Sequence, residues 1–309
     1  MYLIRTNRIQ TDYRSQILRA EADFEAQLVR SAEALLSVEQ LQIVTVTGPS
    51  CSGKTTTAEK LRCMLEKAGH PVYMVSIDNF FRDRASLPKT KSGRTDYDTA
   101  ASLDLDCLTR CLDLLVREEE TDLPVFDFRT GTRSGYTRYI PRENDIILLE
   151  GIQAMYPEIR SHLPYAVTRS VAIGPQEDVC AVGVGGSAVR FTAREIRLLR
   201  RLVRDARTRS SGAEQTLAMW EDVCFNEDVN ITPYLCHADI VIDSFLPYEL
   251  SVIRHPAERL LQTIPADSAY HAAARSLTER LAVVIPMPAD EIPDTSVFRE
   301  FIGTGCRTE

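Results

Sequence analysis

The segment Gly48–Thr55 constrains this chain more than any other feature of its 309-residue sequence. It reads GPSCSGKT, which satisfies the spacing G-x-x-x-x-G-K-[ST], and it lies between an apolar run at 43–46 and a helix-like stretch at 58–65. Glycines in such a loop let successive backbone N–H groups curl around an oxyanion, and the N-terminus of the following helix adds partial positive charge. The sequence therefore predicts a phosphate-binding loop between a strand and a helix.

The loop is expected to hold a nucleoside triphosphate together with Mg²⁺. We take the donor to be ATP, with GTP as the alternative, because the motif reads phosphates and not the base. Lys54 would reach the β- and γ-phosphates, and Thr55 would offer its hydroxyl to the cation. The residues expected to bind the nucleotide are Gly48, Ser50, Cys51, Ser52, Gly53, Lys54, Thr55 and Thr56. The sequence has neither an N-K-x-D motif for guanine nor an L-S-G-G-Q signature, which favours transfer of the γ-phosphate to an alcohol over hydrolysis.

Hydrophobic patterns on both sides of this loop predict an α/β fold. A strand from 42, the loop and helix, and a second strand at 72–77 form a βαβ unit, and such a unit implies a parallel sheet. We expect a P-loop NTPase fold, with a mostly parallel sheet covered by helices on both faces. Further strands are predicted at 123–126, 146–149, 167–173 and 239–242, and helices at 103–116 and 270–281.

The same patterns predict how the chain is organised. Residues 1–40 would contribute an amphipathic helix, at 10–38, that packs on the core. Residues 41–250 would form the phosphate-loop core, with an exposed loop at 82–100 and a lid at about 185–212. Residues 251–309 would be a helical and proline-rich extension of the same domain.

Two carboxylates are expected near the phosphates because each ends a predicted strand. Asp78 closes the second strand and Glu150 follows the apolar run 146–149, so both should emerge at the carboxyl edge of the sheet, beside the loop. Asp78 there can accept the proton of an attacking hydroxyl, and Glu150 suits Mg²⁺ or its water ligands. A turn-forming or capping role is the alternative for each.

Eight arginines and only two acids lie in the segment 190–209. Arg197, Arg201 and Arg204 would share one helical face, while Ile196 and Leu199 line another. Arginine favours bidentate phosphate contact, so we interpret this helix as a lid that closes over the nucleotide and excludes water. A solvated or partner-binding helix is the alternative.

Composition limits the other functions of the chain. The net charge of −8 argues against a nucleic-acid partner, and no apolar run approaches the length of a membrane span. The eight cysteines are scattered, with no C-x-x-C pair, and are expected to be free thiols in a reducing, cytoplasmic setting. Self-association into a homo-oligomer stays open.

With these motifs placed, residues of about 42–250 resemble the uridine kinase and phosphoribulokinase family of P-loop kinases, and specifically the bacterial uridine kinase-like nucleoside kinases. The resemblance rests on the ordered motifs GPSCSGKT, SIDNFFRDR, TDYD, LPVFDFRTGTR, IILLEGI and RLLRRLVRDARTR. It implies ATP-dependent phosphorylation of the 5′-hydroxyl of a ribonucleoside, with the nucleoside as a small-molecule partner.

The resemblance also implies roles for individual residues. Asp78 would be the catalytic carboxylate near the 5′-hydroxyl, and Asp98 in TDYD would hold the ribose 2′ and 3′ hydroxyls. Glu150 would assist Mg²⁺. The arginines expected around the phosphates and the acceptor are Arg201, Arg204 and Arg209, with Lys54, Arg201 and Arg204 among the catalytic groups.

The chain departs from the family pattern where the base would be read. Phe81 and Phe126, which are expected to contact the substrate, stand where pyrimidine-specific kinases of the family have tyrosines, and Gly131 stands in place of a histidine. Losing polar readout weakens discrimination between bases. We therefore expect a nucleoside kinase whose base is open, with Gly131 leaving room for a larger one.

Two other functions fit the same motifs. The chain could phosphorylate another small alcohol, such as a phosphosugar or a pantothenate-like acceptor; a phosphosugar would need an extra cationic pocket. It could instead be a regulator that binds ATP without turnover, which would be indifferent to Asp78→Asn.

Overall fold

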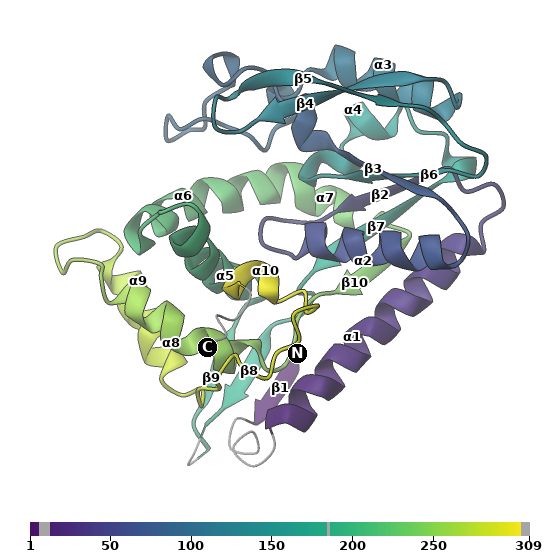
Figure 1. Cartoon of the computed structure of the whole chain (residues 1–309). Coiled ribbons are helices and arrows are strands. Elements are labelled where there is room, and N and C mark those ends of the chain that lie inside the picture. The colour runs from purple at the N-terminus through teal and green to yellow at the C-terminus, as the bar shows by residue number, and fades with distance from the viewer. Residues whose placement is uncertain (6–12, 184–185, 304–309) are drawn as a thin grey trace, which may run out of the picture.

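Five parallel strands form the central sheet of the computed structural model, which describes residues 1–5, 13–183 and 186–303 (Figure 1). The strands are β2 (Ile43–Thr47), β3 (Val72–Ser76), β6 (Ile146–Glu150), β7 (Thr168–Gly174) and β10 (Ile240–Asp243). They lie in the order β10-β7-β2-β6-β3, and each neighbouring pair is parallel. Every residue of β2 and β6 is buried, as expected for strands covered on both faces. The predicted α/β fold is confirmed.

Helices cover both faces of this sheet (Figure 1). On one face, α1 (Tyr13–Leu36) and α2 (Lys54–Lys67) share a hydrophobic core with Val44, Val46 and Leu148. On the other face, α3 (Leu105–Val116) packs over Ile147 and Leu149. The helix predicted at 10–38 is therefore present as α1, although residues 10–12 lie outside the described part of the chain.

Two small sheets lie outside the parallel one. The strand predicted at 123–126 belongs to β4 (Thr121–Asp127), which pairs antiparallel with β5 (Thr132–Tyr139). The second small sheet has the order β1-β8-β9 and consists of β1 (Tyr2–Arg5), β8 (Val179–Val182) and β9 (Ala188–Phe191). The strands β1, β5, β8 and β9 were not predicted from the sequence.

The arginine-rich segment forms α5 (Ala193–Thr208), which begins with a reciprocal cap between Thr192 and Glu195. It packs against α6 (Ala213–Asn226), α8 (Glu249–Leu261) and α10 (Arg299–Ile302), and Figure 1 shows it surrounded by them. Most of its residues, including Arg197 and Arg200, are buried. Movement of α5 as a lid stays a prediction.

The C-terminal part of the described chain packs into the same core as α1 and the sheet. It contains α9 (His271–Leu281), close to the predicted 270–281, and the buried side chains Val297, Phe298 and Phe301. Two further short α-helices are α4 (Pro157–Arg160) and α7 (Thr232–Leu235). The predicted division at 40 and 250 stays a prediction.

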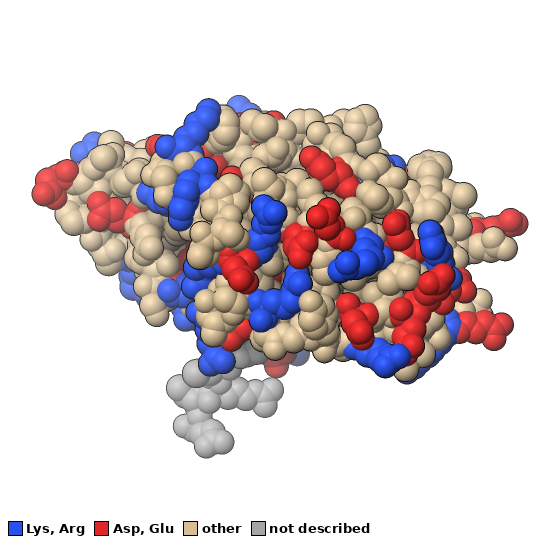
Figure 2. Space-filling view, turned by 90° about the horizontal axis from the view of Figure 1, so that it is seen from above, with Lys and Arg blue, Asp and Glu red and all other residues tan. Residues whose placement is uncertain are grey.

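The surface and the cysteines complete this description. Figure 2 shows basic and acidic side chains interspersed on the face above β4, β5 and α3. Across the described ranges, no helix has both the length and the apolar character that a membrane crossing requires. The seven described cysteines are free thiols, and Cys306 lies outside the described residues.

Candidate active site

The phosphate loop connects β2 to α2 and passes very close to β7. A Cβ at Gly48 would lie 2.0 Å from the carbonyl oxygen of Ile173, so no side chain fits there. Gly53, just before α2, has a φ of +88°, in the left-handed region that glycine adopts readily. Both glycines of the motif are therefore required by the path of the backbone.

Lys54 and Thr55 begin α2 beside this loop. The Lys54 Nζ lies 3.4 Å from the Pro49 carbonyl oxygen, so the side chain folds back across the loop. Thr55 is exposed on the first turn of the helix, while Thr56 donates a hydrogen bond of 2.8 Å to Glu300 of α10. The two residues predicted to meet the phosphates and the cation thus lie at the mouth of the loop.

Asp78 lies next to Lys54, on a 3-10 helix (Ile77–Phe80) that follows β3. The predicted strand was expected to run to Ile77, but it ends one residue earlier at Ser76. Burial raises the pKa of Asp78 above its ordinary value, while the positive charges of Lys54 and Arg209 act in the opposite direction. A carboxylate in this setting is suited to exchange a proton with a substrate hydroxyl.

Asp98 lies in the same electrostatic neighbourhood. Burial and the nearby Asp96 raise its pKa to about 6, and Arg201, Lys54 and Asp78 contribute to its field. Its backbone is fixed from two sides, because its amide donates to the Asp96 side chain at 2.9 Å and its carbonyl accepts from the Tyr156 hydroxyl at 2.9 Å. The loop predicted at 82–100 therefore presents Asp98 in one defined place.

Glu150 ends β6 and is buried. Burial raises its pKa to about 7, and the charges that act on it are those of Lys54, Asp78 and Glu300. Three carboxylates and one lysine therefore lie at the carboxyl edge of the sheet, the edge at which open α/β sheets hold ligands.

One buried carboxylate, Asp205, gathers the three predicted arginines. Its oxygens lie 3.2 Å from Arg201 Nε, 2.7 Å from Arg204 Nη2 and 3.6 Å from Arg209 Nε. Arg201 also donates to the Ser50 Oγ at 3.0 Å. In the sequence, Asp205 is one of the two acids in the segment 190–209, and no local pattern marks it as the shared partner of the arginines.

Residues 43–182 match the model of the phosphoribulokinase/uridine kinase family. A uridine kinase from Anoxybacillus flavithermus is 28% identical over 202 residues, which cover 65% of this chain and 84% of that protein. Uridine-cytidine kinase C from Dictyostelium discoideum is 31% identical over 144 residues, 46% of this chain and 30% of that protein. Among solved structures, a possible uridine kinase from Bacillus stearothermophilus aligns with a TM-score of 0.49 and 18% identity, over 72% of this chain and 100% of that one.

Over its phosphate-loop core, this chain is similar to the P-loop kinases of the uridine kinase family. The kinase has a cavity of about 670 Å³ beside the phosphate loop. The predicted site residues that line it are Ser50, Asp78, Phe81, Asp98, Arg201 and Arg209. Ser50 of the phosphate loop, the two aspartates and two of the arginines therefore share one space.

Phe126 and Gly131 lie differently from what the sequence suggested. Phe126 is buried behind the cavity, where its ring packs edge-on against Phe81 and Phe128, and Phe128 lines the cavity instead. At Gly131 a Cβ would lie 2.8 Å from the side chain of Arg84. The expectation that Gly131 leaves room for a larger base is wrong, because Arg84 fills that room.

Sequence reasoning missed several lining residues of the kinase. Tyr97, Phe128 and Gln153 line the cavity, as do Lys89 and Lys91 from the loop at 82–100 and Met219 and Asn226 from α6. Tyr97 and Phe128 lie inside the motifs TDYD and LPVFDFRTGTR, so those motifs contained a usable signal. Met219 and Asn226 of α6 are remote in sequence from these motifs, and no sequence pattern marks them as lining residues.

Proposed function

We propose that this kinase transfers the γ-phosphoryl group of ATP to the 5′-hydroxyl of a ribonucleoside. The observation that supports this most strongly is the shared cavity, in which Asp78 and Asp98 face the phosphate-loop residue Ser50 together with Arg201 and Arg209. A hydroxyl-binding carboxylate, a proton-accepting carboxylate and phosphate-binding cations are the groups that such a transfer uses.

Asp78 is the group that would act on the acceptor. It would orient the 5′-hydroxyl and take its proton as the oxygen forms a bond to the γ-phosphorus, while the bond from that phosphorus to the bridging oxygen breaks and ADP leaves. Its raised pKa makes the carboxylate a better proton acceptor than an exposed aspartate. Lys54, Arg201 and Arg204 would balance the negative charge on the transferring group.

The donor set around the loop suits Mg²⁺ held mostly through phosphate and water. Among the residues the structure describes, no three His, Cys, Asp or Glu side chains gather to hold a metal ion. Thr55 supplies an exposed hydroxyl and Glu150 a carboxylate, and Mg²⁺ typically takes few protein ligands of this type. Bound there, Mg²⁺ would neutralise phosphate charge.

On the acceptor side, Asp98 would accept hydrogen bonds from the ribose 2′ and 3′ hydroxyls. Phe81, Tyr97 and Phe128 form an aromatic wall of the same cavity, with Phe81 edge-on to both other rings. Such a wall suits a planar base without selecting strongly among bases.

A second acceptor class is favoured by one observation. Lys89, Lys91 and Arg94 line the same cavity, and among these cations Arg94 pairs with Asp222 at 3.1 Å while Lys91 lies over the Phe225 ring at 3.8 Å. These are the additional cations that a phosphosugar acceptor would need.

The deciding experiment measures ADP release with MgATP and one acceptor at a time: five nucleosides, a phosphosugar and pantothenate. We expect turnover with at least one nucleoside, and we expect Asp78→Asn to lower kcat by roughly 100-fold or more. Asp106→Asn, an exposed aspartate on α3, is the matched control and should keep wild-type activity. Turnover only with the phosphosugar or pantothenate would show that the acceptor is that compound and not a nucleoside. ATP binding with no turnover of any acceptor would favour a regulator that binds ATP without catalysis.

A further inference from the structure

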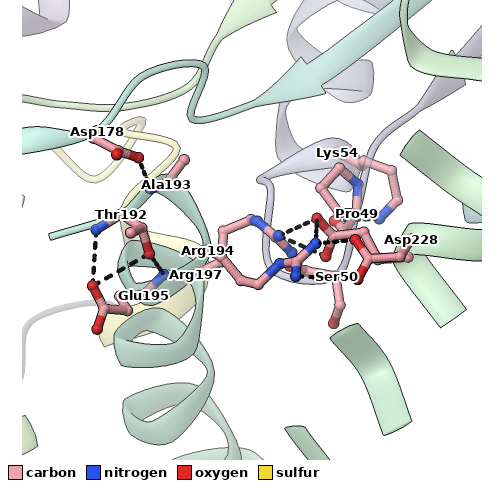
Figure 3. Close-up of polar contacts among 11 residues, drawn as sticks. Pro49, Ser50, Lys54, Asp178, Thr192, Ala193, Arg194, Glu195, Arg197 and Asp228 are labelled. Carbon is pink, nitrogen blue, oxygen red and sulfur yellow. Dashed lines mark hydrogen bonds and ion pairs between the residues drawn. The ribbon is translucent and has the colours of Figure 1, made fainter. Parts of the chain in front are cut away.

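We propose that Arg197 and Arg200 are positioning residues that hold the phosphate loop in its nucleotide-binding shape. The inference rests on the proposed function only in taking the loop to bind ATP. It concerns arginines other than Arg201, Arg204 and Arg209, which the resemblance places around the phosphates. Neither residue lines the acceptor cavity. Both are more than nine-tenths buried. Figure 3 shows Arg197 extending from α5 toward Ser50 of the loop.

Arg197 links the loop to the end of α6. Its Nη1 donates to the Ser50 carbonyl oxygen at 3.1 Å, while its Nη2 lies 2.6 Å from both oxygens of the buried Glu227. Its guanidinium also lies 5.6 Å from the centre of the Trp220 ring. The guanidinium is thus held from two other directions while one N–H points at the loop.

Arg200 makes the equivalent link one residue further along the loop. Its Nη1 donates to the Cys51 carbonyl oxygen at 3.2 Å, and its Nη2 donates to the Ser244 carbonyl oxygen at 2.7 Å. The same group is paired at 2.7 Å with Glu249 of α8, and both side chains are 1% exposed. Burial raises the pKa of Glu249 to about 7, and the charge of Arg200 opposes that shift. Removing either side chain would leave the other as an unpaired buried charge.

A phosphate loop needs such donors for a geometric reason. When successive N–H groups turn inward to meet an anion, neighbouring carbonyl oxygens turn outward and require partners of their own. Cys51 also has a φ of +60°, a backbone conformation that a residue other than glycine adopts only when its surroundings impose it. The guanidinium groups of Arg197 and Arg200 satisfy the carbonyls of Ser50 and Cys51 and fix this conformation.

The test measures binding of MgATP to the full chain by calorimetry, without any acceptor. Arg197→Gln keeps hydrogen-bonding capacity but loses the forked cation, and we expect its Kd for ATP to rise roughly 10-fold or more. Arg194→Gln is the matched control, because Arg194 lies on the same helix and pairs with Glu227 and Asp228 but is 36% exposed. It should leave the Kd for ATP near the wild-type value.

Arg197→Lys keeps the charge, and we expect its Kd for ATP to lie between those of wild type and Arg197→Gln. It serves as the test variant if Arg197→Gln does not fold. The melting temperature is measured alongside, since a residue with only a structural role would lower it without changing the Kd of the folded protein. A Kd within about twofold of wild type in the folded variant, or equal weakening by Arg194→Gln, overturns the proposal. If wild type binds MgATP but turns over no acceptor, the proposed function fails and this inference is still decided by the Kd values.

Discussion

Asp98 shows how a binding site can oppose the stability of the fold at one side chain. Its pKa of about 6 lies above the ordinary aspartate value because burial disfavours the charged form. Between pH of about 3.8 and about 6, the folded protein therefore retains a proton on Asp98 that the unfolded chain has lost. The stabilisation from this difference is complete below the unfolded pKa of about 3.8 and is lost as the pH rises through about 6.

Replacing Asp98 with Asn removes this penalty together with the charge that we propose binds the ribose hydroxyls. At pH 8 we expect Asp98→Asn to raise the free energy of unfolding by roughly 1–2 kcal/mol, and at pH 4 to change it little. The same variant should raise KM for the nucleoside by roughly 10-fold or more. For wild type, KM for the nucleoside should rise as the pH falls below about 6, because Asp98 becomes protonated.

Urea unfolding at the two pH values and acceptor titrations at saturating ATP check these expectations. Asp106→Asn, on the surface of α3, again serves as the control. An equal free energy of unfolding for Asp98→Asn and wild type at pH 8 would show that the buried charge of Asp98 does not destabilise the fold.

At the scale of elements, the β4–β5 hairpin shapes the far wall of the acceptor cavity through Arg84. The Arg84 amide donates to the Gly131 carbonyl at 2.8 Å, and its Nε donates to the Tyr97 hydroxyl at 3.1 Å. Its Nη2 hydrogen-bonds the Phe128 carbonyl. Arg84 thus contacts the hairpin turn through its amide and two of the three aromatic residues of the wall through its side chain.

Arg84→Ala should widen the range of accepted bases, because it empties the space beside Gly131 and releases Phe128 and Tyr97. We expect the ratio of kcat/KM for purine over pyrimidine nucleosides to rise roughly 10-fold. Arg82→Ala, an exposed arginine two residues earlier, is the matched control. An unchanged ratio in Arg84→Ala would mean that the base does not reach the hairpin.

Elements were predictable where their neighbours impose a pattern on the sequence. β2 and β6 are continuous apolar runs because both of their faces are covered, and α1 carries its buried side chains at helical spacing. β5 is different: its sequence is TRSGYTRY, and among its residues only Tyr139 is buried, so no apolar alternation marks it.

Site residues follow the same division. The positions of Lys54, Asp78 and Glu150 were predictable because each lies at a fixed place relative to a strand end; their roles stay predictions. The partners of the arginines on α5 were not, since Glu227 and Glu249 come from other helices and only the folded chain brings them to Arg197 and Arg200.

At the scale of the whole molecule, the phosphate loop is enclosed by segments from distant parts of the chain. Val297 packs on Gly53, where a Cβ would lie 2.8 Å from it, and Glu300 accepts the hydrogen bond of Thr56. Glu300 also contributes to the field at Glu150. The segment beyond α9 therefore belongs to the surroundings of the nucleotide site.

The pairing of the central strand has a consequence for the time course of folding. Within β2, Ile43 pairs with Ile147 of β6 and with Thr168 of β7, so the chain must close long loops before the phosphate loop has its supports. MgATP should therefore slow unfolding, because it binds the completed site, and leave the refolding rate unchanged, because that site forms after the rate-limiting step. Mixing experiments in urea with and without MgATP measure both rates, and faster refolding with MgATP would contradict this order of events. In a cell, ATP would then prolong the lifetime of the folded protein by slowing its unfolding, and it would not speed the folding of newly made chains.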